Sequence, residues 1–556
     1  MKVAMAQINS TVGDVEGNLS KIRKFLEDAK QCKADLVIFP ELAVVGYPPQ
    51  DLLLQKGFVE KNRKALEEMI ESNTIDVVAV VGFVDYVGKD LYNAAAVFKK
   101  DKFVGVVYKT LLPTYDVFDE DRYFKSLDEK QIAPLTVTLE RKTIKLGVEI
   151  CEDLWDSNYN IKVTDLLVRK GAELIVNISA SPFLVGKHLE RNRLLRKKSI
   201  ENGVPIFYCN LVGGQDELVF DGQSMAVDTD GHPIAIGKQF EEDLVITDVN
   251  LETGKAIIVG LPMHDKTKEM FNALVLGIRD YLKKTGFEKT VIGMSGGIDS
   301  SITACIAVEA VGKDNVIGIS MPSKFSSDHS KSDAEQLAEN LGICFVKVGI
   351  QDIVDSYHVT LDGPLTKIRK CFDIKKESDD PVADENIQPR VRGNVLMDIS
   401  NRLKDLKILV LNTGNKTEIA LGFCTLYGDM AGGIGAIGDV SKLEVYKLAE
   451  YFNKKSEKQI IPQSVFNKRP SPELRECHFD PFDFNVVSPL VDEIIERRRS
   501  KQDLIKMGYP KEVVEDIYRR VRNSEYKRRQ ATPCIKITPK AFGIGWKMPM
   551  VNKYIG

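Results

Sequence analysis

The chain has 556 residues, with 77 lysines and arginines against 80 aspartates and glutamates, a formal net charge of −3 at pH 7 and 43% hydrophobic residues. Because an ordinary domain has roughly 100–200 residues, this length predicts at least two domains, and the average composition excludes disordered, collagen-like and coiled-coil chains. The near-neutral charge balance supplies no strongly basic surface, so we expect no nucleic-acid partner.

The first half of the chain alternates strand-like apolar runs with amphipathic helical stretches, which predicts α/β layering. Helices are expected at residues 15–31 and 58–72. Strands are expected at residues 2–8, 35–41, 76–84, 93–98, 103–109, 143–150, 172–179, 204–210, 223–231 and 243–250. A segment with glycine and proline at residues 254–265 closes this half, and we expect domains over residues 1–255 and 256–556.

The second half is predicted to fold as a doubly wound parallel sheet, in which ligands bind at the carboxyl ends of the strands. A helix at 267–286 leads into a strand at 289–295, a glycine-rich turn and a helix at 300–312. Further strands are expected at 316–320, 344–350 and 407–414, and further helices at 332–342 and 391–404.

The cysteines and the N-terminus indicate the compartment. The nine cysteines are odd in number and scattered, and none forms a CxxC pair, so neither a disulfide framework nor a structural zinc site is predicted. The first residues are a short apolar-leaning run with one lysine, unlike a signal peptide, and no uninterrupted apolar stretch approaches the length of a membrane span. We therefore expect a cytoplasmic protein without a membrane partner.

Three predicted strands of the first half end on residues with complementary chemistry. Glu41 ends the string VIFPE, Lys109 follows VVY, and Cys151 follows GVEI. Each residue alone is unremarkable in type, since cysteines are often small buried hydrophobes and charges often cap strands in solvent. Together, a carboxylate that accepts the thiol proton, a thiol that attacks an amide carbon and a cation that stabilises the oxyanion indicate covalent hydrolysis of an amide.

The strings FPE, YKTLLP and ICEDLW resemble those of the nitrilase, or carbon–nitrogen hydrolase, superfamily over about residues 1–250. The resemblance implies an αββα sandwich with Glu41 as general base, Lys109 as transition-state stabiliser and Cys151 as nucleophile.

The same resemblance implies how an amide substrate is held. Glu120, in YDVFDEDRYF, resembles an additional carboxylate of the superfamily that helps to position substrate. In its glutaminase branch, Tyr115, Ser181 and Lys187 fall where glutamine is bound, and a lysine can pair with the α-carboxylate of the substrate.

A phosphate loop follows the predicted strand at 289–295. In the string SGGIDSS, Gly296 and Gly297 allow backbone N–H groups to approach an oxyanion, and the next helix contributes its N-terminal dipole. The string has no lysine of the Walker type, which disfavours transfer of a γ-phosphoryl group.

SGGIDSS resembles the pyrophosphatase loop of the ATP-pyrophosphatase superfamily, which cleaves ATP between the α- and β-phosphates and adenylates a carboxylate or amide. The resemblance implies that Asp299 holds Mg²⁺, which prefers hard oxygen ligands. The residues of this segment implied to bind ATP are Gly293, Met294, Ser295, Gly296, Gly297, Ile298, Asp299 and Ser300.

Three further strings resemble NAD synthetases, and the similarity spans about residues 265–556. They are NTGNKTEIALGFCTLYGDMAGGIGAIGDVSK, NIQPRVRGNVLMDISN and RRQATPCIKITPKAFGIGW. Together with the first half, they imply a ligase in which a nitrilase-type glutaminase supplies ammonia that amidates ATP-adenylated deamido-NAD. The products would be NAD⁺, AMP, diphosphate and glutamate, and this family is also oligomeric.

Carried over position by position, the resemblance to NAD synthetases assigns roles in the second half. Thr413 and Lys442 are expected to contact ATP, and Glu418 to share Mg²⁺ with Asp299 and to touch deamido-NAD. The residues expected to hold deamido-NAD are Asn386, Arg390 and Lys527, together with Glu418.

Other interpretations stay open at this point. The GxGxxG string at Gly433, Gly435 and Gly438 lacks a preceding buried strand and is a weak dinucleotide signal. The six histidines form no HxxxH or HExxH pair, so no protein metal cage is predicted. Another amidotransferase or an RNA-modifying enzyme on the same fold is the nearest rival, and a non-catalytic scaffold is the rival from a different class.

Overall fold

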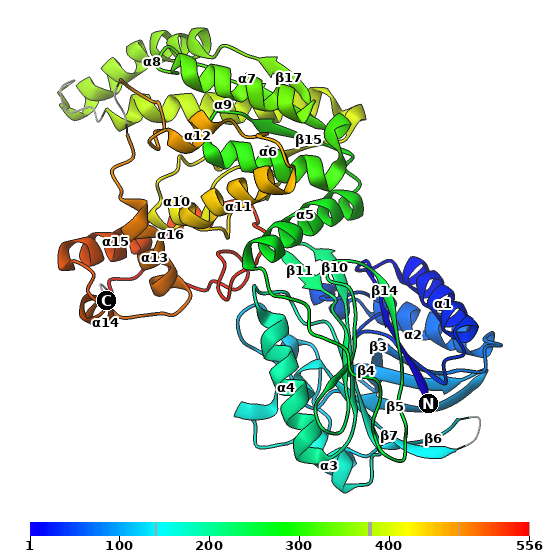
Figure 1. The fold of residues 1–556 in the computed structure, drawn as a ribbon. Helices are drawn as coiled ribbons and strands as arrows, with labels where there is room; N and C mark the ends of the chain where they lie inside the picture. Colours follow the sequence, from blue (N-terminus) through cyan, green and yellow to red (C-terminus); the bar gives the residue numbers. More distant parts are fainter. Residues whose placement is uncertain (140–141, 376–380, 477–478, 555–556) are drawn as a thin grey trace. The chain divides into compact units, whose positions relative to one another are not determined.

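The computed structural model describes residues 1–139, 142–375, 381–476 and 479–554, which form two compact units, Met1–Asp265 and Lys266–Gly556 (Figure 1). The sequence places its division between residues 255 and 256. In the structure, residues 256–265 belong to the first unit, where the N–H of Val259 donates to the carbonyl of Pro233 at 2.8 Å.

Two six-stranded sheets form the centre of the first unit. In spatial order, the first sheet contains β14 (Asp243–Asp248), β1 (Lys2–Gln7), β2 (Leu36–Ile38), β3 (Val78–Val87), β4 (Asp90–Lys99) and β5 (Lys102–Tyr108). The second contains β13 (Pro233–Ile236), β12 (Met225–Val227), β9 (Ile206–Asn210), β8 (Leu174–Ser179), β7 (Thr143–Ile150) and β6 (Leu135–Thr138). A separate ribbon pairs β10 (Val212–Gln215) with β11 (Leu218–Asp221).

Alternation along the strands decides how these sheets pack. Successive side chains of a strand point to opposite faces, so Val3 and Met5 of β1 lie in one core while Ala4 and Ala6 lie in another. The core of Val3 and Met5 also contains Val148 of β7, and it therefore fills the space between the two sheets.

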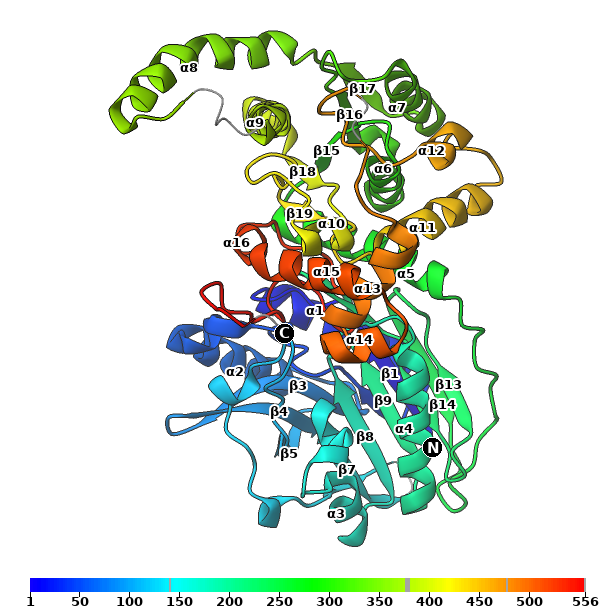
Figure 2. The same cartoon turned by 90° about the vertical axis from the view of Figure 1, so that its left-hand side faces the viewer.

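Helices cover the two outer faces of this pair of sheets. Helices α1 (Val15–Gln31) and α2 (Lys56–Glu71) pack on the first sheet, and α3 (Val163–Arg169) and α4 (Lys187–Asn202) pack on the second (Figures 1 and 2). Helix, sheet, sheet and helix make four layers, and the αββα sandwich implied by the resemblance is confirmed.

The second unit is built on a five-stranded sheet in which all neighbouring strands are parallel. In spatial order it contains β17 (Cys344–Lys347), β16 (Val316–Ser320), β15 (Lys289–Gly293), β18 (Ile408–Asn412) and β19 (Ile434–Gly435). The chain enters at β15 and adds strands first on one side and later on the other, which confirms the doubly wound topology. Ligands bind where the direction of strand addition reverses, here between β15 and β18.

The helices of the second unit fall into two groups. Those in the part of the chain that forms the sheet are α5 (Lys266–Thr285), α6 (Ile298–Val311), α7 (Asp328–Leu341), α8 (Gln351–Phe372), α9 (Val382–Arg402), α10 (Lys416–Leu421), α11 (Lys442–Lys455) and α12 (Gln463–Asn467). The C-terminal group is α13 (Phe484–Ile495), α14 (Lys501–Lys506), α15 (Lys511–Asn523) and α16 (Glu525–Arg528). No helix within the described ranges is long and apolar enough to cross a membrane.

Helix α8 was not predicted. Its sequence contains Gly363 followed by Pro364, a pair that normally marks a turn, yet the helix continues through both. In Figure 2, α8 extends away from the strands of its own sheet, and Val354 is the one side chain of α8 that is buried. The helices α3 and α4 and the strands β6, β10, β11 and β13 of the first unit were likewise not predicted.

Candidate active sites

The ends of three strands bring Glu41, Lys109 and Cys151 into one buried region of the first unit. Lys109 and Cys151 directly follow β5 and β7, and Glu41 follows β2 after two residues. The exposed fractions of Glu41, Lys109 and Cys151 are 0%, 1% and 6%. Gly82 of β3 makes room for the turn that carries Glu41, because a Cβ there would lie 2.4 Å from the carbonyl oxygen of Pro40.

Three donors fix the carboxylate of Glu41. Its Oε1 accepts hydrogen bonds from Lys109 Nζ and from Asn93 Nδ2, each at 2.7 Å. Its Oε2 accepts from the backbone N–H of Ala180 at 2.8 Å. The carboxylate is therefore held in one orientation beside the lysine.

Lys109 lies between two carboxylates. Its Nζ also donates to both oxygens of Glu120, at 2.9 and 2.8 Å, and the hydroxyl of Tyr47 donates to Glu120 at 2.8 Å. Burial by itself lowers the pKa of Lys109, but the charges of Glu120 and Glu41 outweigh it and hold the pKa well above its ordinary value. The ammonium therefore stays charged in the absence of solvent.

Cys151 begins a tight turn with an unusual backbone. Its φ of 46° is in the left-handed region, which costs energy for any residue other than glycine and persists only where the surroundings impose it. Burial, and then the charge of Glu41, raise the pKa of the thiol well above its ordinary value, although Lys109 opposes them. At neutral pH the resting thiol is thus protonated, and attack requires a base at hand.

The residues implied to hold glutamine have different partners. Glu120 contacts Lys109 directly, as described. The hydroxyl of Tyr115 donates to the carboxylate of Glu152, the residue after Cys151, at 3.1 and 3.0 Å. The backbone N–H of the buried Ser181 donates to the side chain of Asn210 at 3.0 Å.

Lys187 begins helix α4 and lies over an aromatic ring. Its Nζ is 4.1 Å from the ring centroid of Trp155 and 3.0 Å from Oε2 of Glu190. The indole face holds the ammonium by a cation–π contact, and the exposed carboxylate of Glu190 pairs with its charge.

The second unit has a cavity of about 320 Å³ at the carboxyl ends of its parallel strands. Gly293 at the end of β15, Ser320 at the end of β16 and Asn412 at the end of β18 line it. This is the position that the doubly wound topology predicts for a ligand, and its volume is in the range of small-molecule sites.

The glycine-rich loop between β15 and α6 lines this cavity. Gly296 has a φ of 74°, and a Cβ there would lie 2.2 Å from the carbonyl oxygen of Ser330, so glycine alone fits. Ser295 Oγ lies 3.2 Å from Ser300 Oγ and accepts from the N–H of Gly297 at 3.2 Å. The loop residues that line the cavity are Gly293, Met294, Ser295, Gly297, Ile298, Asp299 and Ser300, whereas Gly296 is not among the lining residues.

Asp299 and Glu418 converge on the ammonium of Lys442. Lys442 Nζ lies 2.5 Å from Asp299 Oδ2 and 3.1 Å from Glu418 Oε1, and Asn415 Nδ2 donates to Asp299 Oδ1 at 2.9 Å. Burial raises the pKa of Glu418 to about 7, although Lys442 opposes the shift. Asp299, Glu418 and Lys442 line the cavity, whereas Asn415 is not among its lining residues. Thr413, just after β18, also lines it.

Asn386, Arg390 and Lys527 meet at one loop, residues 422–426. Asn386 Oδ1 accepts from Thr425 Oγ1 at 2.7 Å, and Arg390 Nε donates to the carbonyl of Leu426 at 3.3 Å. Lys527 Nζ donates to the carbonyls of Gly422 and Cys424, at 2.8 and 2.6 Å. None of the three predicted residues is itself among those that line the cavity in the described part of the chain.

Comparison with known proteins decides the family. Residues 2–258 match the carbon–nitrogen hydrolase family model, and residues 270–531 match the NAD synthase family model. A glutamine-dependent NAD(+) synthetase of Thermotoga maritima is 41% identical over 591 aligned residues, which cover 100% of this chain and 99% of that protein. This chain belongs to the glutamine-dependent NAD(+) synthetase family.

Further relatives agree with this assignment. A Synechocystis member is 42% identical over 574 residues and covers 99% of both proteins. The solved structure of the Acinetobacter baumannii glutamine-dependent NAD+ synthetase in complex with ADP is 36% identical, with a TM-score of 0.77 over 99% of this chain and 98% of that one. The Cytophaga hutchinsonii enzyme has a TM-score of 0.82 over 99% of this chain and 98% of that one and, at 22% identity, supports the fold alone. Both family resemblances are confirmed, and the RNA-modifying alternative is not favoured.

The structure adds site residues of this family member that sequence reasoning missed. Asn93 contacts Glu41, Asn415 contacts Asp299, and Arg392 lines the cavity of the second unit. Arg392 donates from Nε to the carbonyl of Met321 at 3.1 Å, and burial lowers the pKa of its guanidinium to about 10.

Arg392 stands two residues after Arg390 on α9, and residues two apart point to different faces of a helix. The sequence indicated that α9 binds substrate, but it could not indicate which arginine faces the cavity.

Two other features are settled by packing. A Cβ on Gly435 or Gly438 would lie 2.8 or 2.0 Å from Cys534 Sγ, so these glycines of the GxGxxG string serve close packing.

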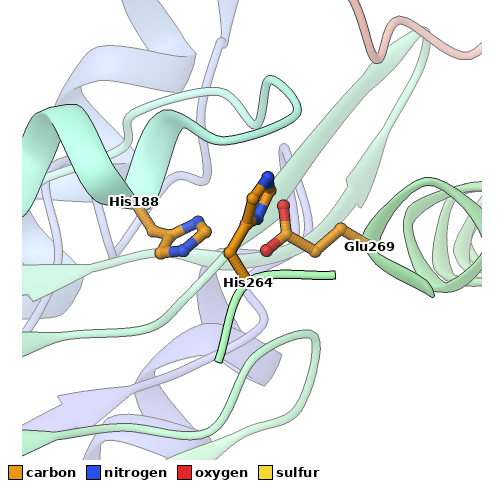
Figure 3. A group of neighbouring side chains, drawn as sticks. All are labelled: His188, His264 and Glu269. Carbon is orange, nitrogen blue, oxygen red and sulfur yellow. The ribbon is translucent and has the colours of Figure 1, made fainter. Parts of the chain in front are cut away.

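His188 and His264, which are isolated in the sequence, lie in the first unit with ring centroids 5.1 Å apart (Figure 3). Glu269, the third side chain labelled in Figure 3, belongs to the other unit. The first unit by itself thus offers two imidazoles, half of the ligand set of a structural zinc site, and we assign no metal.

Proposed function

We propose that this chain hydrolyses glutamine in residues 1–255 and, in residues 256–556, uses the ammonia to amidate ATP-adenylated deamido-NAD. The products are NAD⁺, AMP, diphosphate and glutamate, so the protein is a ligase that forms a C–N bond with glutamine as nitrogen donor. The observation that carries the proposal is the pairing of a buried Glu41–Lys109–Cys151 group in one unit with a strand-end cavity in the other.

Glutamine hydrolysis follows from the resting state of the first site. As the sulfur of Cys151 attacks the amide carbon, Glu41 accepts the thiol proton, and the Lys109 ammonium stabilises the oxyanion that forms. Collapse of this intermediate expels ammonia, which takes the proton from Glu41, and leaves a thioester on Cys151. Water then hydrolyses the thioester to glutamate and restores the thiol.

Four further residues hold glutamine in this proposal. Glu120 contacts Lys109 Nζ, and Tyr115 contacts the residue after Cys151. Ser181 follows Ala180, whose N–H donates to Glu41, and Lys187 would pair with the α-carboxylate. Lys187 pairs with the exposed carboxylate of Glu190 in this structure. The α-carboxylate of glutamine would take that place while the Trp155 ring keeps the ammonium in position.

ATP is the co-substrate of the second site, where the segment Gly293–Ser300 with Thr413 and Lys442 binds it. Asp299 and Glu418 fit a Mg²⁺ ion, because two carboxylates converge on one cationic position and supply hard oxygen ligands. These residues would hold the ion where it would supply positive charge against the leaving diphosphate. Asn386, Arg390, Glu418 and Lys527 hold deamido-NAD in this proposal. Glu418 lines the cavity, and the other three contact the loop 422–426, of which Phe423 and Cys424 line it.

The test of this function is release of AMP from ATP. We expect AMP release to require deamido-NAD and either glutamine or ammonium, and to match NAD⁺ formation one to one, because adenylation precedes amidation. The assay measures AMP and NAD⁺ in parallel with each component omitted in turn. AMP release that proceeds without deamido-NAD, or that depends on tRNA, would contradict the proposal.

We also propose that the protein is a cytoplasmic homo-oligomer that needs no nucleic-acid or membrane partner. Five apolar residues of α8 recur at spacings of three and four and remain 40–73% exposed, and they are Tyr357, Leu361, Leu365, Ile368 and Phe372. Such spacing forms the stripe with which helices pack against each other. A second copy of the same stripe is its self-complementary partner.

The molecular mass in solution, measured by light scattering after size-exclusion chromatography, tests this interface. We expect the wild-type protein to have at least twice the mass of the monomer, and the double substitution Leu361→Glu with Ile368→Glu to lower that mass. Val359→Glu is the matched control, because Val359 lies on the same helix, is 81% exposed and stands outside the stripe. A monomeric wild-type protein, or an unchanged mass in the double variant, would contradict the interface.

A further inference from the structure

Asp153 connects the two segments that carry Lys109 and Cys151. Its side chain is 1% exposed. Oδ1 accepts hydrogen bonds from the backbone N–H groups of Thr110 at 3.0 Å and Leu111 at 2.8 Å. Oδ2 accepts from the N–H of Ile150 at 3.0 Å. One carboxylate therefore holds the residues just after Lys109 and the residue just before Cys151.

The pattern of these bonds goes beyond capping of a turn. A cap of the turn that begins at Cys151 needs the bond to Ile150 alone, which spans three residues. The bonds to Thr110 and Leu111 span 43 and 42 residues and join the end of β5 in the first sheet to the end of β7 in the second. Burial raises the pKa of Asp153 to about 7, and the three backbone N–H donors oppose that shift because they stabilise the charged form.

Neighbouring buried acids have other partners. Glu149 accepts from Thr164 Oγ1 at 2.9 Å and from Asn177 Nδ2 at 3.3 Å, and Asp156 pairs with Lys198 Nζ at 2.6 Å. Those contacts join β7 and the following turns to α3, β8 and α4, within the second sheet and its own helices. Burial is thus common to all three acids. The adjacent buried acid Glu152 accepts from the Tyr115 hydroxyl, whereas Asp153 holds the backbone directly after Lys109.

We propose that Asp153 is a positioning residue for glutamine hydrolysis, which sets the Lys109 ammonium and the Cys151 thiol at their working distance. The role rests on the proposed glutaminase function. The left-handed backbone of Cys151 makes such a clamp necessary, because a strained conformation persists only where several contacts impose it. Misplacement of a reacting group by about 1 Å costs on the order of 100-fold in rate.

The test compares Asp153→Ala and Asp153→Asn with Asp156→Asn, which removes the charge of another buried acid in the same segment. We expect kcat for glutamine hydrolysis to fall about 100-fold in Asp153→Ala while KM changes less than about threefold, because geometry is lost and binding is kept. Asp153→Asn should lose about tenfold, since its oxygen still accepts from Thr110 and Leu111 whereas its NH₂ cannot accept from Ile150. Asp156→Asn should keep kcat within about threefold at a comparable loss of Tm.

Two further readouts separate positioning from folding. NAD⁺ synthesis from ammonium should stay within about twofold of wild type in every variant, because the second unit is untouched. Alkylation of Cys151 by iodoacetamide should be at least about tenfold slower in Asp153→Ala, because the thiol no longer meets its base. This readout uses no glutamine, so it tests Asp153 even if the proposed glutaminase function is wrong.

Three outcomes would overturn the positioning role. They are unchanged kcat and alkylation in Asp153→Ala, an equal loss of kcat in Asp156→Asn at the same Tm, and a rise in KM that accounts for the whole effect. If Asp153→Ala fails to fold, the same criteria are applied to Asp153→Asn, for which wild-type kcat and alkylation would overturn the role.

Discussion

Cys151→Ala is expected to lower glutamine-dependent NAD⁺ formation by at least about 1,000-fold while ammonium-dependent formation stays within about twofold of wild type. The nucleophile has no substitute, since alanine cannot form the thioester. The cavity at the ends of β15, β16 and β18 belongs to the other unit and keeps all of its residues. The measurement is the rate of NAD⁺ formation with glutamine and, separately, with ammonium.

Cys209→Ala is the matched control for this result. Cys209 is a fully buried cysteine of the same unit, and its thiol donates to the carbonyl of Ile38 at 3.2 Å. The Cys209→Ala variant should keep both activities within about threefold, because it loses a small buried thiol that takes no part in the reaction. Equal loss of both activities in Cys151→Ala, or an acyl group trapped on another cysteine and detected by mass, would contradict the assignment of the nucleophile.

Asp299→Asn is expected to lower AMP release by at least about 100-fold with glutamine and with ammonium alike, because the change is in the site that both routes share. Asparagine keeps the size of the side chain but removes the charge that faces Lys442 Nζ at 2.5 Å and that would hold Mg²⁺. Hydrolysis of glutamine by the first unit should persist. The measurement is AMP release with each nitrogen source, together with glutamate release.

Asp333→Asn is the control for charge removal in the second unit. Asp333 is buried on α7, accepts from Ser464 Oγ and is not among the residues that line the cavity. It should keep AMP release within about threefold, since it touches no substrate. Near-normal rates with ammonium in Asp299→Asn would show that the glycine-rich loop does not carry the adenylation chemistry.

Much of the fold could be predicted from local pattern. Helix α1 spans the residues expected for it, and β7 and β16 begin and end as expected, because an amphipathic period or an apolar run between turns is a local property of the chain. Helix α8 was missed because its Gly363–Pro364 pair indicates a turn, and because its apolar stripe is 40–73% exposed and so does not show the burial expected of a core helix.

The sequence by itself determined which chemical groups stand at strand ends. Glu41, Lys109 and Cys151 each follow an apolar run, and the glycines of SGGIDSS meet a backbone requirement that acts within a few residues. Such features depend on neighbours along the chain, and so their positions in the fold could be inferred from the sequence.

Only the tertiary structure decided which of these groups have partners. The bond from Leu111 to Asp153 spans 42 residues, that from Asn93 to Glu41 spans 52, and Arg392 rather than Arg390 lines the cavity. The physical reason is that hydrogen bonding and burial depend on which faces meet in space. Residues far apart in the sequence come into contact when sheets and helices pack. The hydrophobic periodicity of one segment does not indicate which other segment it will pack against.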